Sequence, residues 1–169
     1  RTLTLFGEIN QDVARRMAEK LLALAFESDD PITLYIGSPG GHVESGDTIF
    51  DLIRYIKPEV RIIGTGWVGS IATHIYLAAD KANRYALPNT RFLIHQPSGG
   101  FGGDAADIEI HAREILKTRE RINGIIAERT GQTIDRVGED TQRDYWMSAE
   151  ESVEYGLVGK IINDIGEVG

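Results

Sequence analysis

The chain contains the three residue types that together perform acyl transfer, namely a serine, a histidine and an aspartate. They are Ser70, His95 and Asp144. Acyl transfer by a serine needs a base that takes the hydroxyl proton, a group that orients this base, and donors for the developing oxyanion. Ser70 follows an apolar run and precedes a helical pattern, so a tight turn could present its hydroxyl as a nucleophile. The alternative is that Ser70 only caps the helix, because serine is a favoured N-cap residue.

The histidine and the aspartate each have two interpretations. His95 follows a buried strand, where its ring would be held fixed while it faces a cleft at the strand ends. Asp144 lies in a turn, from which its carboxylate could accept a hydrogen bond from the imidazole and fix the tautomer. The plainer alternatives are a histidine bonded within the core and a turn aspartate that bonds its own backbone. The presence of all three favours a serine hydrolase.

Oxyanion donors are predicted at a double glycine and at the residue after the serine. Gly40 and Gly41 follow an apolar strand and allow backbone N–H groups to point into a cleft. A phosphate cradle is the competing interpretation, but the chain has no Gly-Lys-Ser/Thr ending and no G-x-G-x-x-G. The N–H groups of Gly41 and Ile71 are therefore the predicted donors. The G-x-S-x-G signature is absent around Ser70, which disfavours an α/β-hydrolase.

Strand and helix patterns alternate along the chain and must position these residues. Two short helices are predicted to begin at Thr133 and Ser148, the second with a capping box to Glu151 and an end at Gly156. Alternation of this kind predicts a mostly parallel sheet flanked by helices, with no linker that divides residues 1–169. The predicted strands are 3–6, 32–36, 60–63, 82–86 and 91–94. A first helix, which Asn10 or Asp12 can cap, is predicted to run to about Phe26, and two further helices are predicted at 45–55 and 71–79.

A long helical pattern follows the glycine-rich stretch 97–103 and runs from Asp104 to about Arg129. About 26 residues at 1.5 Å each reach roughly 40 Å, more than twice the length of an average helix. Because so small a domain cannot cover such a helix, we favour packing against another copy of the chain. The alternative is an exposed helix held by charged pairs along its surface.

Composition limits the function classes. The 18 basic and 26 acidic residues give a net charge of −8, and no basic cluster suggests a nucleic-acid partner. The chain has no cysteine, which excludes disulfides and thiolate metal sites and fits the cytoplasm. No metal site is predicted, and no apolar run is long enough to cross a membrane. No signal peptide opens the sequence. Since it begins at Arg1 without a methionine and directly in a strand-like run, we expect that an N-terminal segment was processed off or left out.

Taken in order, the motifs resemble the ClpP peptidase family, the proteolytic subunit of the ATP-dependent Clp protease. The resemblance covers essentially the whole chain and implies an α/β fold, a crotonase-like spiral of βαβ units. It also implies one peptidase domain, residues 1–169, with a protruding handle at about 97–130. The residues that carry the resemblance are Ser38-Pro39-Gly40-Gly41, Gly69-Ser70, Leu87-Pro88-Asn89, Ile94-His95-Gln96-Pro97, Asp107–Leu116, Asp140-Thr141, Arg143-Asp144 and Tyr155–Val158.

The resemblance also implies roles for individual residues. Ser70 takes the position of the nucleophile, His95 that of the general base and Asp144 that of the orienting carboxylate. Gly41 and Ile71 take the oxyanion-hole positions. An extended peptide is expected to bind by strand addition, in which backbone hydrogen bonds give affinity with little demand on sequence. The implied substrate-binding residues are His42, Val43, Glu44, Ser98, Gly99 and Gly100.

The implied partners are other protein chains. The family resemblance predicts two stacked heptameric rings around a closed chamber, either homomeric or mixed with a second ClpP. An AAA+ unfoldase of the Clp family would hydrolyse ATP and supply unfolded polypeptides, since this chain has no nucleotide motif and no predicted cofactor. Two alternatives are a regulatory or structural ring subunit with little activity of its own and an acyl-CoA enzyme on the same spiral fold. The intact triad favours the peptidase.

The sequence departs from the family pattern in three places. Ser70-Ile71-Ala72-Thr73 stands where Ser-Met-Gly-Ala is usual, and the segment that forms the axial pore loops has no counterpart. His74 occupies a usually apolar position one turn after Ser70. We interpret His74 as a buried, hydrogen-bonded histidine, and the alternative is a second titrating group near the site. These departures indicate a second, atypical copy of the subunit.

Overall fold

The computed structural model describes residues 1–100 and 102–169, and Phe101 of the glycine-rich stretch lies outside the described residues. The described chain forms one sheet in the order β1-β2-β3-β4-β7, with β5 beside β3 and β6 beside β5. Every pair is parallel except β5 with β6, which confirms the predicted mostly parallel sheet. The strands are β1 (Thr2–Phe6), β2 (Ile32–Ser38), β3 (Val60–Gly69), β4 (Arg84–Ala86), β5 (Arg91–Ile94), β6 (Tyr145–Met147) and β7 (Lys160–Ile161).

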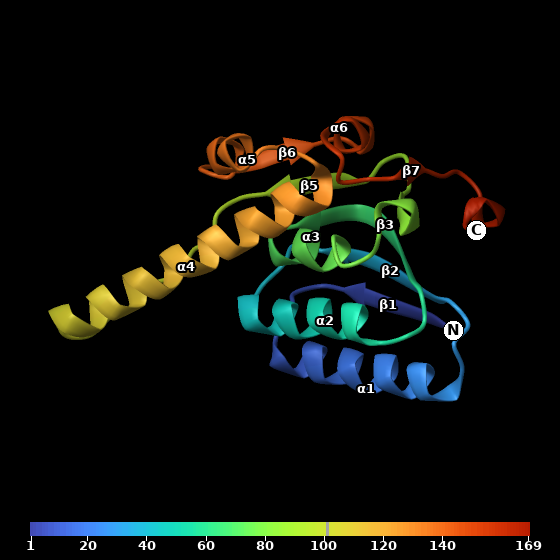
Figure 1. The fold of residues 1–169 in the computed structure, drawn as a ribbon, viewed down its shortest axis with the longest axis horizontal. Helices are drawn as coiled ribbons and strands as arrows, with labels where there is room; N and C mark the ends of the chain where they lie inside the picture. Colours follow the sequence, from blue (N-terminus) through green and yellow to red (C-terminus); the bar gives the residue numbers. More distant parts are fainter. Residues whose placement is uncertain (101) are drawn as a thin grey trace.

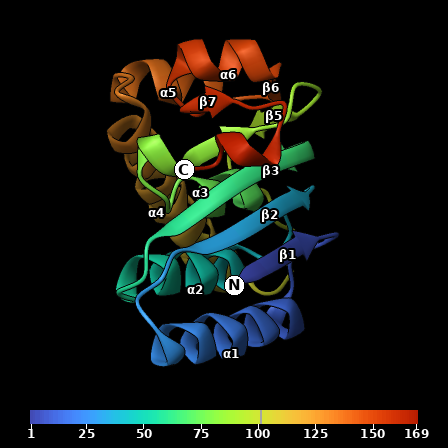
Figure 2. The same ribbon diagram turned by 90° about the vertical axis from the view of Figure 1, so that its right-hand side faces the viewer.

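Helices α1, α2 and α3 follow one another along the sheet as the strands ascend from β1 to β3 (Figure 1). This succession of strand and helix units gives the predicted α/β spiral. The view in Figure 2 shows β1, β2 and β3 side by side, with α2 and α3 behind them. The α-helices are α1 (Gln11–Glu27), α2 (Val43–Tyr55), α3 (Ile71–Tyr76), α4 (Ala105–Thr130), α5 (Ile134–Asp140) and α6 (Ala149–Tyr155), and the 3₁₀ turns are η1 (Lys81–Asn83) and η2 (Ile165–Glu167).

Short-range signals set the helix ends. The Asn10 side chain accepts a hydrogen bond from the Val13 N–H at 2.9 Å and so caps α1. Ser148 and Glu151 form the predicted capping box of α6. The residue after α6, Gly156, has a φ of 95°, a left-handed conformation that glycine adopts at little cost. These ends confirm the predicted starts and stops.

The core lies between the sheet and the helices. Alternate residues of β2, namely Ile32, Leu34 and Ile36, are fully buried. Met17 and Leu21 of α1 pack in the same apolar cluster. Burial of one such side chain contributes about 1.5–3 kcal/mol relative to leaving it exposed, so these rows fix which face of each element turns inward.

Helix α4 projects from the body of the molecule as a long handle, as predicted (Figure 1). Its last turns are anchored by the buried side chains of Ile122 and Ile126. Near its end the Arg129 guanidinium donates hydrogen bonds to the carbonyl oxygens of Leu77 at 3.0 Å and Ala79 at 2.7 Å. The C-terminal end of the handle is therefore fixed to the segment that follows α3.

Several boundaries differ from the sequence prediction, among them the end of β2 at Ser38 rather than Ile36 and the start of β4 at Arg84 rather than Ala82. Strand β3 does not end at Ile63 but continues to Gly69, because Trp67–Gly69 pairs with β5. Helix α3 ends at Tyr76 rather than Ala79, and α2 begins at Val43 rather than Ser45. The short strand β7 was not predicted. Within the described residues, no helix is both long and apolar enough to cross a bilayer.

Candidate active site

Ser70 lies at a strained corner between β3 and α3. Its φ of 56° makes it the only described residue other than glycine with a positive φ, a conformation that costs on the order of 1–3 kcal/mol. The Ser70 N–H donates to the Leu93 carbonyl at 3.0 Å, and the Thr73 hydroxyl donates to the Val68 and Leu93 carbonyls at 2.9 Å. Ser70 occupies the N-cap position of α3 but makes no side-chain cap bond. Its hydroxyl is therefore available to another residue.

The structure brings the three candidate catalytic side chains into one hydrogen-bonded row. The Ser70 Oγ lies 2.8 Å from His95 Nε2. The His95 Nδ1 lies 2.9 Å from Asp144 Oδ1. With a proton on Nδ1, the ring donates to the carboxylate and accepts from the serine hydroxyl.

Strand pairing explains how residues so distant in sequence meet. Strand β5 runs parallel to the end of β3 with Leu93 beside Gly69, so the residues after both strands lie at the same sheet edge. Strand β6 runs antiparallel to β5 with Tyr145 beside Ile94. This pairing brings Asp144, which directly precedes β6, to the end of β5.

Exposure differs along the row. The His95 side chain keeps 26% of its accessible surface, whereas the Asp144 side chain keeps 64%. Water therefore screens the attraction between the carboxylate and the ring more than in a buried pair. Orientation of the ring by the short hydrogen bond is the larger contribution of Asp144.

The double glycine lies directly against the Ser70 turn. A Cβ at Gly40 would lie 2.7 Å from the Ser70 Cβ and 3.1 Å from the Ile71 nitrogen, so only glycine permits this approach. Ile9 donates to the Gly40 carbonyl at 2.9 Å and accepts from the His42 N–H at 2.8 Å. This parallel bridge turns the N–H of the intervening Gly41 away from Ile9.

Ile71 provides the second predicted oxyanion donor. It is the first residue of α3, and the first N–H groups of a helix have no intrahelical acceptor. The Ile71 and Gly41 N–H groups have no protein acceptor among the described backbone hydrogen bonds. The structure therefore leaves two backbone donors near the Ser70 corner.

Of the two segments predicted to bind substrate, the first contributes Val43 to a small cavity that Ser70 and His95 also line, and Pro97 directly before the second lines it too. Val43 and Glu44 begin α2, and His42 precedes them with its Nδ1 2.8 Å from the Ser45 hydroxyl oxygen. The second group, Ser98–Gly100, directly follows β5 and has no regular secondary structure. The start of α2 and the residue after Gln96 therefore lie beside the row, and the roles of the six residues in substrate binding stay a prediction.

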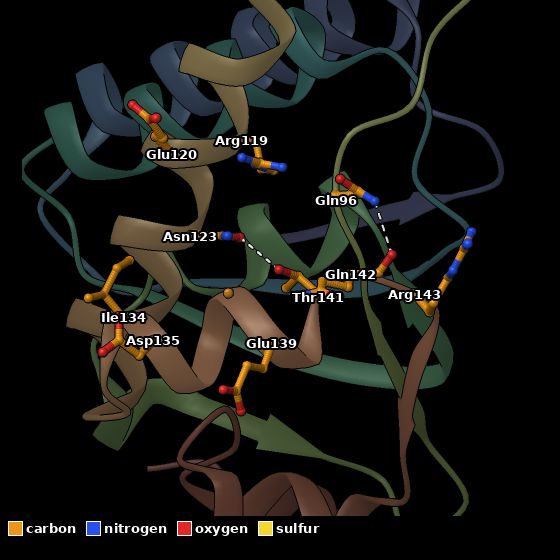
Figure 3. Close-up of a pocket in the computed structure, with 11 residues that line it drawn as sticks. Gln96, Arg119, Glu120, Asn123, Ile134, Asp135, Glu139, Thr141, Gln142 and Arg143 are labelled. Atoms are coloured by element: carbon orange, nitrogen blue, oxygen red, sulfur yellow. Dashed lines mark hydrogen bonds between the residues drawn. The ribbon is translucent and has the colours of Figure 1, made fainter.

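Two hollows flank the row. A small cavity of about 20 Å³ adjoins Ser70 and His95 and is lined mainly by apolar side chains. A larger polar hollow of about 790 Å³ lies between α4, α5 and the segment before β6. In it Gln96 donates to the Gln142 carbonyl at 3.0 Å, and Thr141 donates to Asn123 at 3.2 Å (Figure 3). The larger hollow contains none of the three residues of the row.

The sequence analysis missed two charged residues near the serine. Asp47 of α2 lies 3.1 Å from the buried His74 ring and forms a two-bond ion pair with Arg121 of the handle. The only signal in the sequence was an acidic residue next to the buried positions Ser45, Gly46, Ile49, Phe50 and Ile53 of the same helix. Among residues 1–100 and 102–169, no group of three or more His, Asp or Glu side chains could hold a metal ion.

A Ser-His-Asp row at the strand ends of an α/β spiral is the arrangement of a serine hydrolase. The sequence model of the family described as "Clp protease" matches residues 1–164. The chain therefore belongs to the Clp protease family, and it is a serine-type peptidase subunit of that family.

Similar proteins support this assignment over nearly the full length. The ATP-dependent Clp protease proteolytic subunit 3 of Rhizobium meliloti is 55% identical over 168 residues, which cover 99% of this chain and 86% of the relative. Proteolytic subunit 2 of Pseudomonas aeruginosa is 55% identical over 162 residues, or 96% of this chain and 81% of the relative. The solved structure of an Asn-to-Asp mutant of ClpP1 from Listeria monocytogenes has a TM-score of 0.95 and 51% identity, and the match covers 100% of this chain and 95% of that one.

Proposed function

We propose that this peptidase subunit cleaves peptide bonds of unfolded polypeptides with Ser70 as nucleophile, His95 as general base and Asp144 as the orienting carboxylate. The observation that carries the proposal is the continuous row, with 2.8 Å between Ser70 Oγ and His95 Nε2 and 2.9 Å between His95 Nδ1 and Asp144 Oδ1. The strained backbone at Ser70 supports it, since strain of this kind is typical of functional residues.

The geometry fits a two-step acyl transfer. The Ser70 oxygen attacks the peptide carbonyl while its proton passes to His95 Nε2, and the N–H groups of Gly41 and Ile71 bind the oxyanion. His95 then gives the proton to the leaving amine, which departs and leaves an acyl-serine. A water molecule, deprotonated by the same ring, hydrolyses this ester and restores the free serine.

Substrate binding is proposed to use the two segments beside the corner. An extended peptide would lie between them and gain backbone hydrogen bonds, a mode that gives affinity with little sequence selection. Such binding suits an enzyme that degrades many different chains. The residues proposed to bind the peptide are His42, Val43, Glu44, Ser98, Gly99 and Gly100.

The working assembly is proposed to be two stacked heptameric rings, of this chain alone or mixed with a second ClpP. The projecting α4 and the names of the relatives as proteolytic subunits support an assembly. An AAA+ unfoldase of the Clp family is the proposed partner that uses ATP, and this chain is proposed to need no cofactor of its own. We place the complex in the cytoplasm, without nucleic-acid or membrane partners.

A fluorophosphonate probe tests the proposed nucleophile. We expect a stoichiometric adduct on Ser70, located by peptide mass spectrometry, and loss of both the adduct and peptide cleavage in Ser70→Ala. Removal of a triad serine typically costs about 10⁶ in kcat. The control is Ser28→Ala, which changes a half-buried serine just after α1 and should leave labelling intact. An assembled protein that cleaves peptides equally well as Ser70→Ala would contradict the proposal, and an assembled parent without adduct or cleavage would support a regulatory ring subunit.

A further inference from the structure

Two aromatic rings stack across the strands that carry the proposed catalytic row. Trp67 of β3 and Trp146 of β6 have ring centroids 5.8 Å apart and an angle of 17° between their planes. Strand β5 lies between these two strands, and the guanidinium carbon of its Arg91 is 4.4 Å from the centre of the Trp146 ring. Stacked rings attract each other, and so do a cation and the face of an indole. These three side chains, the tryptophan stack, therefore connect β3, β5 and β6.

Strand register places the tryptophan stack on the same sheet face as the His–Asp pair. Trp146 lies beside Leu93 in the antiparallel pair, and the same register, extended by one pair, sets Asp144 opposite His95. Side chains alternate along a strand, so Arg91 and Leu93 share a face that continues to His95. Trp146 and Asp144 share that face for the same reason. The hydrogen bond of 2.9 Å between His95 and Asp144 is thus the next cross-strand contact after the ring of Trp146.

The position of Asp144 depends on the chain on either side of it. Its side chain keeps 64% of its accessible surface, so packing around the carboxylate itself does little to fix it. On one side, Gln96 donates to the Gln142 carbonyl at 3.0 Å. On the other side, β6 has only three residues, Tyr145–Met147, and among the described strands it pairs with β5 alone. Within so short a strand, the contacts of the Trp146 ring are a large part of what holds the residue before it.

We propose that Trp146 is a positioning residue for the reaction: its contacts with Trp67 and Arg91 fix the start of β6 and so keep Asp144 within hydrogen-bond distance of His95. The inference rests on the proposed function. Trp146 acts through Asp144, which in turn orients the imidazole. Displacement of a catalytic group by about 1 Å can cost about 10²-fold in rate, so a modest shift of β6 is enough to matter.

Peptide kinetics of Trp146→Ala test this role. The Trp146 ring is 36% exposed, so its removal leaves the core intact and the variant should fold. We expect kcat to fall about 10–100-fold while KM stays within about twofold, because the orientation of His95 affects the chemical step and not binding. Trp146→Phe keeps a ring that can stack and should retain kcat within about threefold of the parent. The control is Phe26→Ala, which removes a ring that is 97% exposed on α1 and should leave kcat unchanged.

A double-variant cycle shows whether Trp146 acts through Asp144. Asp144→Ala alone should lower kcat about 10⁴-fold, the usual effect of losing a triad carboxylate. In that background Trp146→Ala should have no further effect, because no carboxylate is left to position. A ring that served only folding or assembly would lower activity by the same factor in both backgrounds. Where turnover is too slow to follow, the rate of fluorophosphonate labelling of Ser70 gives the same comparison.

The tryptophan stack can be altered from its other side and observed directly. Trp67→Ala removes the partner ring and leaves β6 unchanged, so it should also lower kcat in the parent and not in Asp144→Ala, which keeps the test available if Trp146→Ala does not assemble. Trp67 and Trp146 are the two tryptophans of the chain. Stacked indoles couple electronically. The tryptophan band in the near-UV circular dichroism of the parent should therefore differ from the summed bands of Trp67→Phe and Trp146→Phe.

The outcomes separate this inference from the proposed function. Parent activity in both Trp146→Ala and Trp67→Ala, or an equal loss with and without Asp144, would overturn the role of Trp146 and leave the proposed function intact. A parent tryptophan band equal to the sum of the two single-ring bands would do the same. A parent protein with neither labelling of Ser70 nor peptide cleavage would overturn both proposals.

Discussion

At the scale of single residues, the site depends on backbone positions that only particular residues tolerate. A Cβ at Gly41 would lie 2.2 Å from the Ile9 carbonyl oxygen, and Gly41 has a φ of 149°. Both facts exclude other residues there. Ser70 adopts a strained backbone conformation with a positive φ, and in this conformation its hydroxyl lies within hydrogen-bond distance of His95. The strained backbone lowers stability, and it places the N–H groups of Gly41 and Ile71 and the Ser70 hydroxyl at the proposed site.

The depressed pKa of Asp47 predicts a pH dependence of stability. Its folded pKa is about 2 against an ordinary 3.8, so the carboxylate stabilises the fold above about pH 4, and this contribution is lost as the pH falls towards 2. We expect about 1 kcal/mol, because part of the carboxylate keeps contact with water and is screened. Urea unfolding of the parent and of Asp47→Asn between pH 5 and pH 2 measures it.

The difference in unfolding free energy between these two proteins should shrink as the pH falls. The matched control is Asp51→Asn, which removes an exposed carboxylate from the same helix and should follow the parent. A constant difference between parent and Asp47→Asn across this range would show that Asp47 is not held by His74 and Arg121.

At the scale of the elements, local sequence patterns identified most strands and helices. The features that they missed depend on pairing between strands that are distant in sequence. The β-branched run of β2 and the caps of α1 and α6 follow from sequence alone. Strand β3 was underestimated because Gly64, Gly66 and Gly69 read as a turn, whereas β2 and β5 pair with this stretch on both sides. Strand β7 has only two residues and therefore no periodicity that could reveal it.

The candidate site also contains residues that local patterns predict and residues whose contacts depend on the tertiary fold. Ser70, His95 and Asp144 were predictable because each lies at a strand end or turn of recognisable type, and the resemblance fixes their order. The pair of Asp47 and Arg121 was not predictable from the sequence. Contact between these two residues depends on the angle at which the handle crosses α2, and no local pattern encodes that angle.

The approach of α2 to α3 gives a prediction about an element contact. A Cβ at Gly46 would lie 2.1 Å from Cγ1 of Ile71, the residue whose N–H is a proposed oxyanion donor. Gly46→Ala should therefore displace Ile71, lower the unfolding free energy by about 1–3 kcal/mol and lower kcat. Urea unfolding and peptide kinetics measure the two effects.

A double variant and a matched glycine test the cause. Ile71→Ala removes the clashing atom. The loss of unfolding free energy in Gly46→Ala/Ile71→Ala should therefore be smaller than the sum of the losses in the two single variants. Gly124→Ala is the control, since a Cβ at this position of α4 would have nothing within 4 Å, and it should raise stability by about 0.5–1 kcal/mol. Simple additivity in the double variant would rule out a clash with Ile71.

At the scale of the whole molecule, the handle separates from the body before its C-terminal turns (Figure 1). Its outer turns carry charged pairs, including Lys117 with Glu114 at 2.7 Å. Exposed pairs of this kind contribute little to stability. Apolar side chains on the same turns are also exposed, and a lone helix gains nothing from them in water. Together these features favour a second copy as the partner of α4 over an exposed helix.

Charge placed on the apolar side chains of the handle should therefore break the assembly without unfolding the subunit. Ile108 is 47% exposed and Ile110 is 55% exposed, so Ile108→Asp/Ile110→Asp loses little within one chain but places two carboxylates in the proposed contact between rings. We expect sedimentation velocity to give smaller particles, with unchanged far-UV circular dichroism and peptidase activity per subunit reduced at least tenfold. Glu114→Gln, which alters an exposed polar residue of the same helix, should sediment as the parent does. If the doubly charged variant keeps the parent mass and activity, α4 is an exposed helix held by its own charged pairs, and ring contact must use another surface.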